Sequence, residues 1–377
     1  MIARSFMMSM EKKPLARKTI QNINPYIPGK PIWELQEELG LSEVIKLASN
    51  ENPLGASPRV RDAITASVAN IHRYPDAGTW ALRQKLAAQL ATTPEQLIVT
   101  NGGDELITLV AETFLEPGDE MIIVSPSFSE YEFGAHLMGA QVITVPLDNQ
   151  FRFNPATILG AVTAHTKILC LCSPNNPTGT YLPKSDLQYI MDRLPKHVIV
   201  LFDAAYSHYA TAADYTNGLE FIREGYPLIV LQTFSKIYGL AGLRIGYGVA
   251  SEELIRSLLK VKEPFSVNAL AQVAACAALE DQEHFQLSLQ VNSQGRDQLC
   301  HAFEELGLSF IKTMSNFVLV ELGSQAKDIY EQLMKQGIIV RYGGTWNLPH
   351  HVRISVGTKA ENARLIDHLT NLSRPRA

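Results

Sequence analysis

Residues 228–246 read LIVLQTFSKIYGLAGLRIG, an apolar run followed by a glycine-rich segment that carries two cations, Lys236 and Arg244. The run LIVL has the length and composition of a buried strand. An unpaired charge in such apolar surroundings is so unfavourable that it is either neutralised or paired. The segment therefore predicts that Lys236 and Arg244 meet an anion, form a covalent bond, or do both.

Four apolar runs upstream follow the same plan of a short strand and then a helical stretch. They are LIVT (97–100), EMIIVSP (120–126), KILCLCSP (167–174) and VIVLFDAAY (198–206). Continuously apolar strands that alternate with helices are typical of a parallel sheet covered on both faces. The sequence therefore predicts an α/β fold with a mostly parallel sheet flanked by helices.

The remainder of the chain predicts a second, smaller domain. Residues 268–306 read as long helices, and short apolar runs such as FVLVEL and HVRISVG then alternate with helical stretches, as in a small α+β layer. A chain of 377 residues also exceeds one average domain. We expect an N-terminal arm and part of the small domain in residues 1–48, the large domain in 49–270, and an interdomain helix with the small C-terminal domain in 271–377.

Composition and charge argue against several classes of protein. The formal net charge is −5 and no basic block occurs, which disfavours a nucleic-acid-binding protein. No run approaches the roughly 18 apolar residues of a membrane-spanning helix, and the first residues lack the apolar segment of a signal peptide. The four cysteines have neither metal-ligand spacing nor the density of a disulfide scaffold. We therefore expect a cytoplasmic protein without nucleic-acid or membrane partners and without a metal site.

Polar residues follow four of the predicted strands, and in an open parallel sheet ligands gather at the carboxyl ends of the strands. A glycine pair, Gly102 and Gly103, opens a helix, where free N–H groups and the helix dipole favour a phosphate. The other three strand ends carry Asn175 with Asn176, Asp203 with Tyr206, and Thr233 with Ser235 and Lys236. Each signal is weak alone, so it is their coincidence that predicts a single ligand site.

One ligand, pyridoxal phosphate, accounts for all four strand ends. Its aldehyde requires a lysine, supplied by Lys236, and its ring nitrogen requires a carboxylate, supplied by Asp203. Its phosphate requires a helix start, hydroxyl groups and an arginine, supplied by Gly103, Thr233 and Arg244. The nucleotide-binding pattern GxxxxGK(S/T), and GxGxxG behind a first strand, do not occur in the sequence. Residues 49–270 are therefore expected to form a pyridoxal-phosphate-binding domain.

Eight motifs are spread along residues 25–369. They are KLASNENPLG (46–55), RYPD (73–76), NGGDEL (101–106), PNNPTG (174–179), DAAY (203–206), TFSKIYGLAGLRIGYG (233–248), PFSVN (264–268) and VRISVG (352–357). With them the chain resembles the fold-type I pyridoxal-phosphate-dependent aminotransferases, and specifically the histidinol-phosphate aminotransferase family of class II. The resemblance implies transamination of histidinol phosphate with 2-oxoglutarate, giving imidazole acetol phosphate and glutamate in histidine biosynthesis.

The resemblance also implies roles for the residues at matching positions. The catalytic pair is Lys236, as Schiff-base lysine and general base, and Asp203 at the pyridine nitrogen. The other cofactor-binding residues are Phe128, stacked on the ring, Asn176 and Tyr206 at the ring hydroxyl, and, around the phosphate, Gly103, Asp104, Thr233, Ser235 and Arg244. Tyr74 would reach the phosphate of a neighbouring subunit, which implies a homodimer with shared active sites. On the substrate side, the anion of the amino donor or 2-oxo acid would be clamped by Arg353 with the help of Tyr26, Asn52 and Arg341.

Four residues depart from the family's pattern. The common DEAY reads DAAY here, with Ala204 in place of a glutamate, and we expect this change to tune the site without abolishing activity. Phe128 stands where a tyrosine is usual, which keeps the stacking and loses a hydroxyl. Tyr342 and Trp346 follow Arg341 in a segment that usually differs, and we expect them to reshape the substrate pocket.

Three alternative functions stay open at the level of the sequence. An aromatic-amino-acid aminotransferase and a decarboxylase of a phosphorylated amino acid would use the same lysine, aspartate and arginines. A non-catalytic effector-binding protein of the same fold would require an appended helix-turn-helix domain, and too few residues precede Asn22 to form one.

Overall fold

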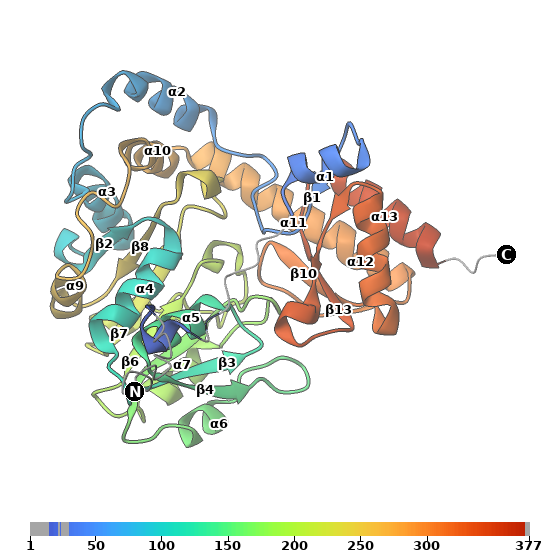
Figure 1. Ribbon diagram of the computed structural model, residues 1–377. Coiled ribbons are helices and arrows are strands. Elements are labelled where there is room, and N and C mark those ends of the chain that lie inside the picture. The colour runs from blue at the N-terminus through green and yellow to red at the C-terminus, as the bar shows by residue number, and fades with distance from the viewer. Residues whose placement is uncertain (1–14, 22, 24–29, 374–377) are drawn as a thin grey trace, which may run out of the picture.

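The computed structural model describes residues 15–21, 23 and 30–373. Figure 1 shows two parts, a large α/β part built on a twisted central sheet and a smaller α+β part that contains both β1 (Ile45–Lys46) and the C-terminal helix α13 (Lys359–Ser373). The long helix α11 (Gln282–Glu305) runs from one part to the other. Segments from both ends of the chain therefore build the smaller part.

Seven strands of the described residues form the central sheet, in the order β2–β8–β7–β6–β5–β3–β4. Strands β3 to β7 run parallel to one another, whereas β8 is antiparallel to both β7 and β2. The strands are β2 Leu97–Thr100, β3 Glu120–Ser125, β4 Gln141–Pro146, β5 Thr166–Cys172, β6 Ile199–Asp203, β7 Leu228–Thr233 and β8 Gly246–Val249.

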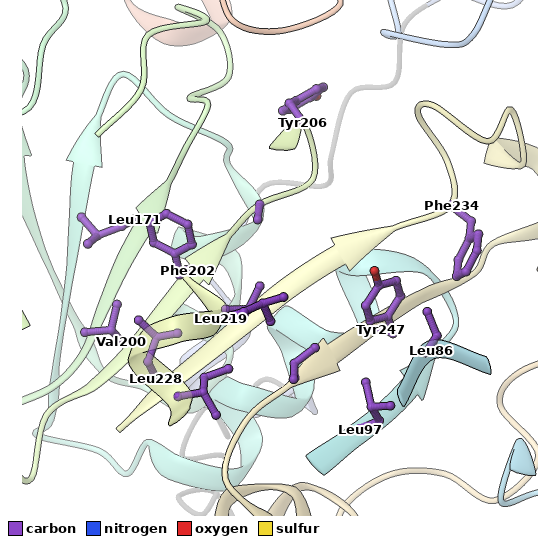
Figure 2. Close-up of a cluster of buried hydrophobic side chains, with 14 of the residues drawn as sticks. Leu86, Leu97, Leu171, Val200, Phe202, Tyr206, Leu219, Leu228, Phe234 and Tyr247 are labelled. Atoms are coloured by element: carbon purple, nitrogen blue, oxygen red, sulfur yellow. The ribbon is translucent and has the colours of Figure 1, made fainter. Parts of the chain in front are cut away.

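Both faces of the central sheet are buried. In β6 the side chains alternate between two hydrophobic clusters, with Val200 and Phe202 in one and Ile199 and Leu201 in the other. Figure 2 shows Val200 and Phe202 beside Leu171, which is the register partner of Phe202 on β5. Burial on both faces explains why the strands are apolar along their whole length instead of alternating with polar residues.

Helices cover the two faces of this sheet (Figure 1), and four of them, α5 to α8, carry the connections between its parallel strands. They are α2 Pro58–Ser67, α3 Trp80–Leu90, α4 Gly102–Phe114, α5 Glu130–Met138, α6 Pro155–Gly160, α7 Lys184–Met191, α8 Leu219–Arg223, α9 Glu252–Leu258 and α10 Ala269–Glu280. Short 3-10 helices occupy Lys18–Ile20, Val68–Asn70, Pro94–Gln96, Ser207–Tyr209, Ala241–Leu243, Gly323–Gln325 and Gly343–Trp346. Helix α4 begins directly after β2, so its N-terminus lies at the edge of the sheet where the parallel strands end.

The smaller part contains a four-stranded antiparallel sheet, ordered β12–β13–β10–β9 among the described residues. A separate parallel pair joins β1, near the start of the chain, to β11, near its end. The remaining elements of the smaller part are α1 Ile32–Leu39, β9 Ser309–Phe310, β10 Phe317–Glu321, α12 Ala326–Lys335, β11 Ile338–Ile339, β12 Arg341–Tyr342 and β13 His351–Ser355. Leu47 shares a hydrophobic cluster with Val318 and Leu365, so the segment after β1 belongs to this core.

The predicted α/β fold with a mostly parallel sheet is confirmed, and all five predicted strands of the large part are present. The sequence did not predict β4 or β8. Strand β4 is largely half-buried or exposed, and β8 contains Gly246 and Gly248, so neither has the continuous apolar pattern of its neighbours.

Residues 15–21, 23 and 30–373 contain neither a membrane-spanning helix nor a metal-binding cluster. No helix in these ranges is long and apolar enough to cross a membrane. The same ranges contain no group of three or more His, Cys, Asp or Glu side chains that could hold a metal ion. The cysteines, at positions 170, 172, 276 and 300, are free thiols.

Candidate active site

A cavity of about 320 Å³ lies at the carboxyl edge of the central sheet, and residues of both parts of the molecule line it. The ends of β6 and β7 contribute Asp203 and Thr233, and β13 contributes Arg353. The predicted site residues that line it are Gly103, Asp104, Phe128, Asn176, Asp203, Tyr206, Thr233, Ser235, Lys236, Arg244, Arg341 and Arg353. Side chains from four separate strand ends thus meet in one cavity.

Lys236 lies three residues beyond the end of β7, and its Nζ is 5.7 Å from the centroid of the Tyr206 ring. Burial, together with the nearby charge of Arg353, lowers the pKa of the Lys236 amine from 10.5 to about 8. A larger fraction of this amine is therefore uncharged at neutral pH than in an exposed lysine. The amine is suited to act as a nucleophile or as a base.

Asp203, the last residue of β6, is 5% exposed. Its Oδ1 accepts a hydrogen bond from the Ala205 N–H at 2.9 Å, and its Oδ2 accepts one from the Tyr131 hydroxyl at 2.6 Å. Burial raises the pKa of the Asp203 carboxyl above its usual value, and these two hydrogen bonds oppose the rise. A buried carboxylate held in this way is suited to pair with a cation in the cavity.

The start of α4 and the β7–β8 connection form a set of hydrogen-bond donors for an anion. Arg244, whose φ is +53°, places Nη2 3.0 Å from Asp104 Oδ2. A β-carbon on Gly102 would lie 2.6 Å from Arg244 Nη2, so the absent side chain provides the space that the guanidinium occupies. Thr233 Oγ1 lies 2.9 Å from Ser235 Oγ. N–H groups of a first helical turn, two hydroxyls and a guanidinium together suit a phosphate.

Arg353 lines the cavity from the smaller sheet and is 5% exposed. Its Nη1 donates to Asn176 Oδ1 and its Nη2 donates to the Ala48 carbonyl oxygen. Its guanidinium carbon lies 5.0 Å from the centroid of the Trp346 ring. Arg341 is the register partner of Arg353 on β12, so the two side chains share a face of the sheet. Two adjacent guanidinium groups suit a carboxylate or a phosphate of a substrate.

Two aromatic side chains, Phe128 and Tyr206, also line the cavity. Phe128 meets the ring of Tyr131 edge-on, with centroids 5.9 Å apart. The Tyr206 hydroxyl oxygen accepts a hydrogen bond from Asn50 Nδ2 at 2.9 Å. Burial raises the pKa of the Tyr206 hydroxyl, so this group keeps its proton at neutral pH.

Three predicted site residues are not among the described residues that line the cavity. Asn52 donates to the Ile237 carbonyl oxygen at 2.7 Å, which ties its loop to the segment that follows Lys236. Tyr74 is 84% exposed and stacks on Phe265 with centroids 4.8 Å apart. Tyr26 lies outside the described residues.

A family model described as aminotransferase class I and II matches residues 42–369. The chain belongs to this family. It is 46% identical over 360 residues to histidinol-phosphate aminotransferase from Moorella thermoacetica, across 95% of this chain and 93% of that relative. It is 42% identical over 353 residues to the protein of the same name from Caldicellulosiruptor saccharolyticus, across 94% of this chain and 98% of that relative.

Solved structures confirm the predicted aminotransferase fold. The histidinol-phosphate aminotransferase from Sinorhizobium meliloti, in complex with pyridoxal-5'-phosphate, is similar with a TM-score of 0.89 and 27% identity. The similarity covers 98% of this chain and 100% of that chain. The two parts of this aminotransferase therefore both have counterparts in that structure.

Sequence reasoning missed three residues at the aminotransferase site, Tyr131, Asn50 and Ala48. Tyr131 carried a usable signal, because it shares one helix face with Gly134 and Ala135, and the hydroxyl of a buried tyrosine usually has a hydrogen-bond partner. Asn50 and Ala48 fall inside the KLASNENPLG motif. Nothing in that motif indicates which of its polar groups face the site, so only the fold identifies them.

Proposed function

We propose that the protein is a pyridoxal-phosphate-dependent histidinol-phosphate aminotransferase. It moves an amino group between histidinol phosphate and 2-oxoglutarate, giving imidazole acetol phosphate and glutamate in histidine biosynthesis. The observation that carries the proposal is the single cavity lined by Lys236, Asp203, Arg244 and Arg353. The choice of substrate is supported by the 46% identity to the Moorella thermoacetica enzyme over 95% of the chain.

The residues of the cavity fit pyridoxal phosphate. An amine with a lowered pKa, Lys236, suits the aldehyde, and the buried carboxylate of Asp203 suits the ring nitrogen. The space that Gly102 leaves for Arg244 lets a helix start and a guanidinium converge on one phosphate. When bound, the coenzyme supplies an aldehyde for the substrate amine and a protonated ring that accepts the electrons released as the α-proton leaves.

Lys236 would move the proton in this reaction. With a pKa of about 8, its amine can take a proton from the α-carbon of the substrate and release it again near neutral pH. Asp203, held by Tyr131 and Ala205, would favour the charged form of the ring nitrogen by ion pairing. Phe128 would stack on the ring. The ring oxygen would be bound by Asn176 and Tyr206, and the phosphate by Gly103, Asp104, Thr233, Ser235 and Arg244.

Arg353 and Arg341 would bind the anionic group that both substrates carry. 2-Oxoglutarate presents a carboxylate where histidinol phosphate presents a phosphate, and a guanidinium fork accepts either group. The hydrogen bonds of Arg353 to Asn176 and Ala48 hold the guanidinium in place before a substrate arrives. Less side-chain entropy is then lost on binding. Asn52 and Tyr26 remain proposed helpers on this side.

We also propose a cytoplasmic homodimer with shared active sites. The exposed Tyr74, stacked on Phe265, is available to a second copy of the chain, which supports this assembly. The division into residues 1–48, 49–270 and 271–377 stays part of the same proposal.

The deciding experiment compares two amino donors with 2-oxoglutarate as acceptor. The purified protein, loaded with pyridoxal phosphate, is offered histidinol phosphate or phenylalanine, and glutamate formation is followed. We expect kcat/KM to be at least about 100-fold higher for histidinol phosphate, because its phosphate pairs with two buried or half-buried guanidinium groups.

The same assay separates the alternatives. A preference for phenylalanine would indicate an aromatic-amino-acid aminotransferase. Absence of turnover with both donors, in a protein that binds the coenzyme, would refute the proposed transaminase. Lys236→Ala serves as the control, because it should lose both turnover and the absorption band that arises from the covalent link between the coenzyme and Lys236.

A further inference from the structure

Asn50 is hydrogen-bonded through all of its polar groups. It is 1% exposed, and its Nδ2 donates to the Tyr206 hydroxyl oxygen at 2.9 Å. Its Oδ1 accepts from the Ser355 hydroxyl at 2.9 Å, and its N–H donates to the same Ser355 oxygen at 2.8 Å. Its carbonyl oxygen accepts from Asn316 Nδ2 at 2.9 Å. Asn50 therefore links Tyr206, which follows β6, to β13 and to the residue that precedes β10.

The amide of Asn50 determines what the Tyr206 hydroxyl can do. An amide nitrogen only donates, so the Tyr206 oxygen accepts that hydrogen bond and keeps its own proton for another acceptor. Tyr206 lines the cavity. The hydroxyl is thus left as a donor toward whatever the cavity holds.

The same segment is bonded to the strand that carries Arg353. Ser355 lies two residues after Arg353 on β13, so their side chains share a face of the sheet. Arg353 itself donates to the carbonyl oxygen of Ala48, two residues before Asn50. Residues 48–50 therefore connect the Tyr206 hydroxyl to the substrate-binding strand.

The backbone at this position restricts the residue type. The φ of Asn50 is +56°, in the left-handed region that glycine adopts freely and that asparagine and aspartate tolerate. Of these three residues, only asparagine can donate a hydrogen bond to Tyr206 and accept one from Ser355 at the same time.

We propose that Asn50 is a positioning residue of this aminotransferase, which directs the Tyr206 proton to the ring oxygen of the coenzyme and couples that contact to β13. The inference rests on the proposed function, because the ring oxygen belongs to pyridoxal phosphate. Asn50 acts through Tyr206 and Ser355 and does not itself take part in the chemistry.

Two substitutions test this role without disturbing the backbone. Asn50→Gly removes the amide and keeps the left-handed conformation. Asn50→Asp keeps the size and the acceptor for Ser355, and replaces the donor to Tyr206 with an acceptor. Each is made alone and together with Tyr206→Phe. The charged and titratable groups near Tyr206 stay unchanged in every variant; they are Lys236, Arg353, Asp203, Cys172 and Tyr209.

Two measurements that do not depend on turnover are made on each variant. Coenzyme-free protein is titrated with pyridoxal phosphate, and the absorption of the bound coenzyme is recorded across pH. We expect Asn50→Gly and Tyr206→Phe each to weaken coenzyme binding about tenfold. Both should raise the pH midpoint of the absorption change, because the anionic ring oxygen of the coenzyme is less stable without a hydrogen-bond donor beside it. In the double variant the second change should add less than about twofold, since both changes remove the same contact.

Asn362→Ala is the matched control. Asn362 is also fully buried, and its Oδ1 accepts from the Gly357 N–H at 2.9 Å, but it is not among the described residues that line the cavity. We expect this variant to melt at a lower temperature with unchanged coenzyme affinity and absorption midpoint.

The role of Asn50 is overturned if the two single losses of affinity multiply in the double variant. It is equally overturned if neither Asn50 variant moves the absorption midpoint, and Asn50→Asp decides the matter should Asn50→Gly not fold. A wild-type protein that takes up no pyridoxal phosphate would instead overturn the proposed function, so the two failures are distinguishable.

Discussion

Burial raises the pKa of the Asp203 carboxyl and lowers the pKa of the Lys236 amine. In both groups burial disfavours the charged form. Each residue therefore lowers the stability of the folded protein near neutral pH while it acquires the reactivity that the proposed chemistry needs.

Asp203→Asn should raise the stability of the coenzyme-free protein at neutral pH. The folded-state pKa of Asp203 lies above 3.8, so the folded protein holds a proton that the unfolded chain has released. The free energy of unfolding of the wild type should therefore fall as pH rises from the unfolded-state pKa to the folded-state pKa of Asp203. The loss is about 1.4 kcal/mol for each pH unit between these two pKa values, and it persists at higher pH. Asparagine carries no such proton. Denaturant unfolding at several pH values should show a gap between variant and wild type that widens with pH, and a constant gap would contradict the argument.

The rate at which coenzyme-free protein takes up pyridoxal phosphate should rise with pH around a midpoint near 8. Only the uncharged amine attacks an aldehyde, and the pKa of Lys236 is about 8. Arg353→Gln should move the midpoint upward, because the Arg353 charge is one cause of the lowered pKa. Stopped-flow absorbance measures the rate. Arg256→Gln, an exposed arginine paired with Glu252, should leave the midpoint unchanged, and a wild-type midpoint near 10.5 would refute the prediction.

Many of the residues that the sequence predicted at the site lie at or just beyond the end of a buried strand, such as Asp203 and Lys236. Their position relative to a strand is local information. Tyr131 and Asn50 could not be predicted in the same way, because their hydrogen bonds reach from a helix and a loop to residues 72 and 156 positions away. Only the folded arrangement of the chain creates those contacts.

At the level of the elements, the β7–β8 hairpin explains why the short segment 228–246 carries two cations, Lys236 and Arg244. Strand β8 is antiparallel to β7, so the chain leaves and re-enters the sheet at the same edge, and Lys236 and Arg244 both line the cavity there. Gly246 permits this path, since a β-carbon would lie 2.9 Å from the Gly102 carbonyl carbon. The sequence predicted β7 from its apolar run, whereas the close approach that requires glycine in β8 involves a distant element.

Asn268→Ala should lower the free energy of unfolding by about 1 kcal/mol. Asn268 caps α10, and its Oδ1 accepts the Ala271 N–H at 2.8 Å. Asn268→Ser should recover part of the loss, because a serine hydroxyl can also cap a helix. Urea unfolding measures both variants. Equal stability of the alanine and serine variants would show that the cap contributes little.

For the whole molecule, the proposed homodimer predicts that two inactive variants restore activity when mixed. Lys236→Ala removes the catalytic amine, and Tyr74→Ala removes the residue proposed to reach the other subunit. A mixed dimer then holds one site with Lys236 and Tyr74 both intact. Random reassociation should restore about a quarter of wild-type activity, since about half of the dimers are mixed and each has one intact site of two. Activity no greater than the sum of the separate variants would argue against shared sites.

Arg341 and Arg353 belong to neighbouring strands of the smaller sheet, while Asp203 ends one strand of the central sheet and Lys236 follows another. The connection between β12 and β13 carries Trp346 against Arg353. Natural variation or laboratory evolution can therefore change the residues of this short connection independently of the central sheet. Such changes would alter which compounds are accepted and would leave Lys236 and Asp203 in place.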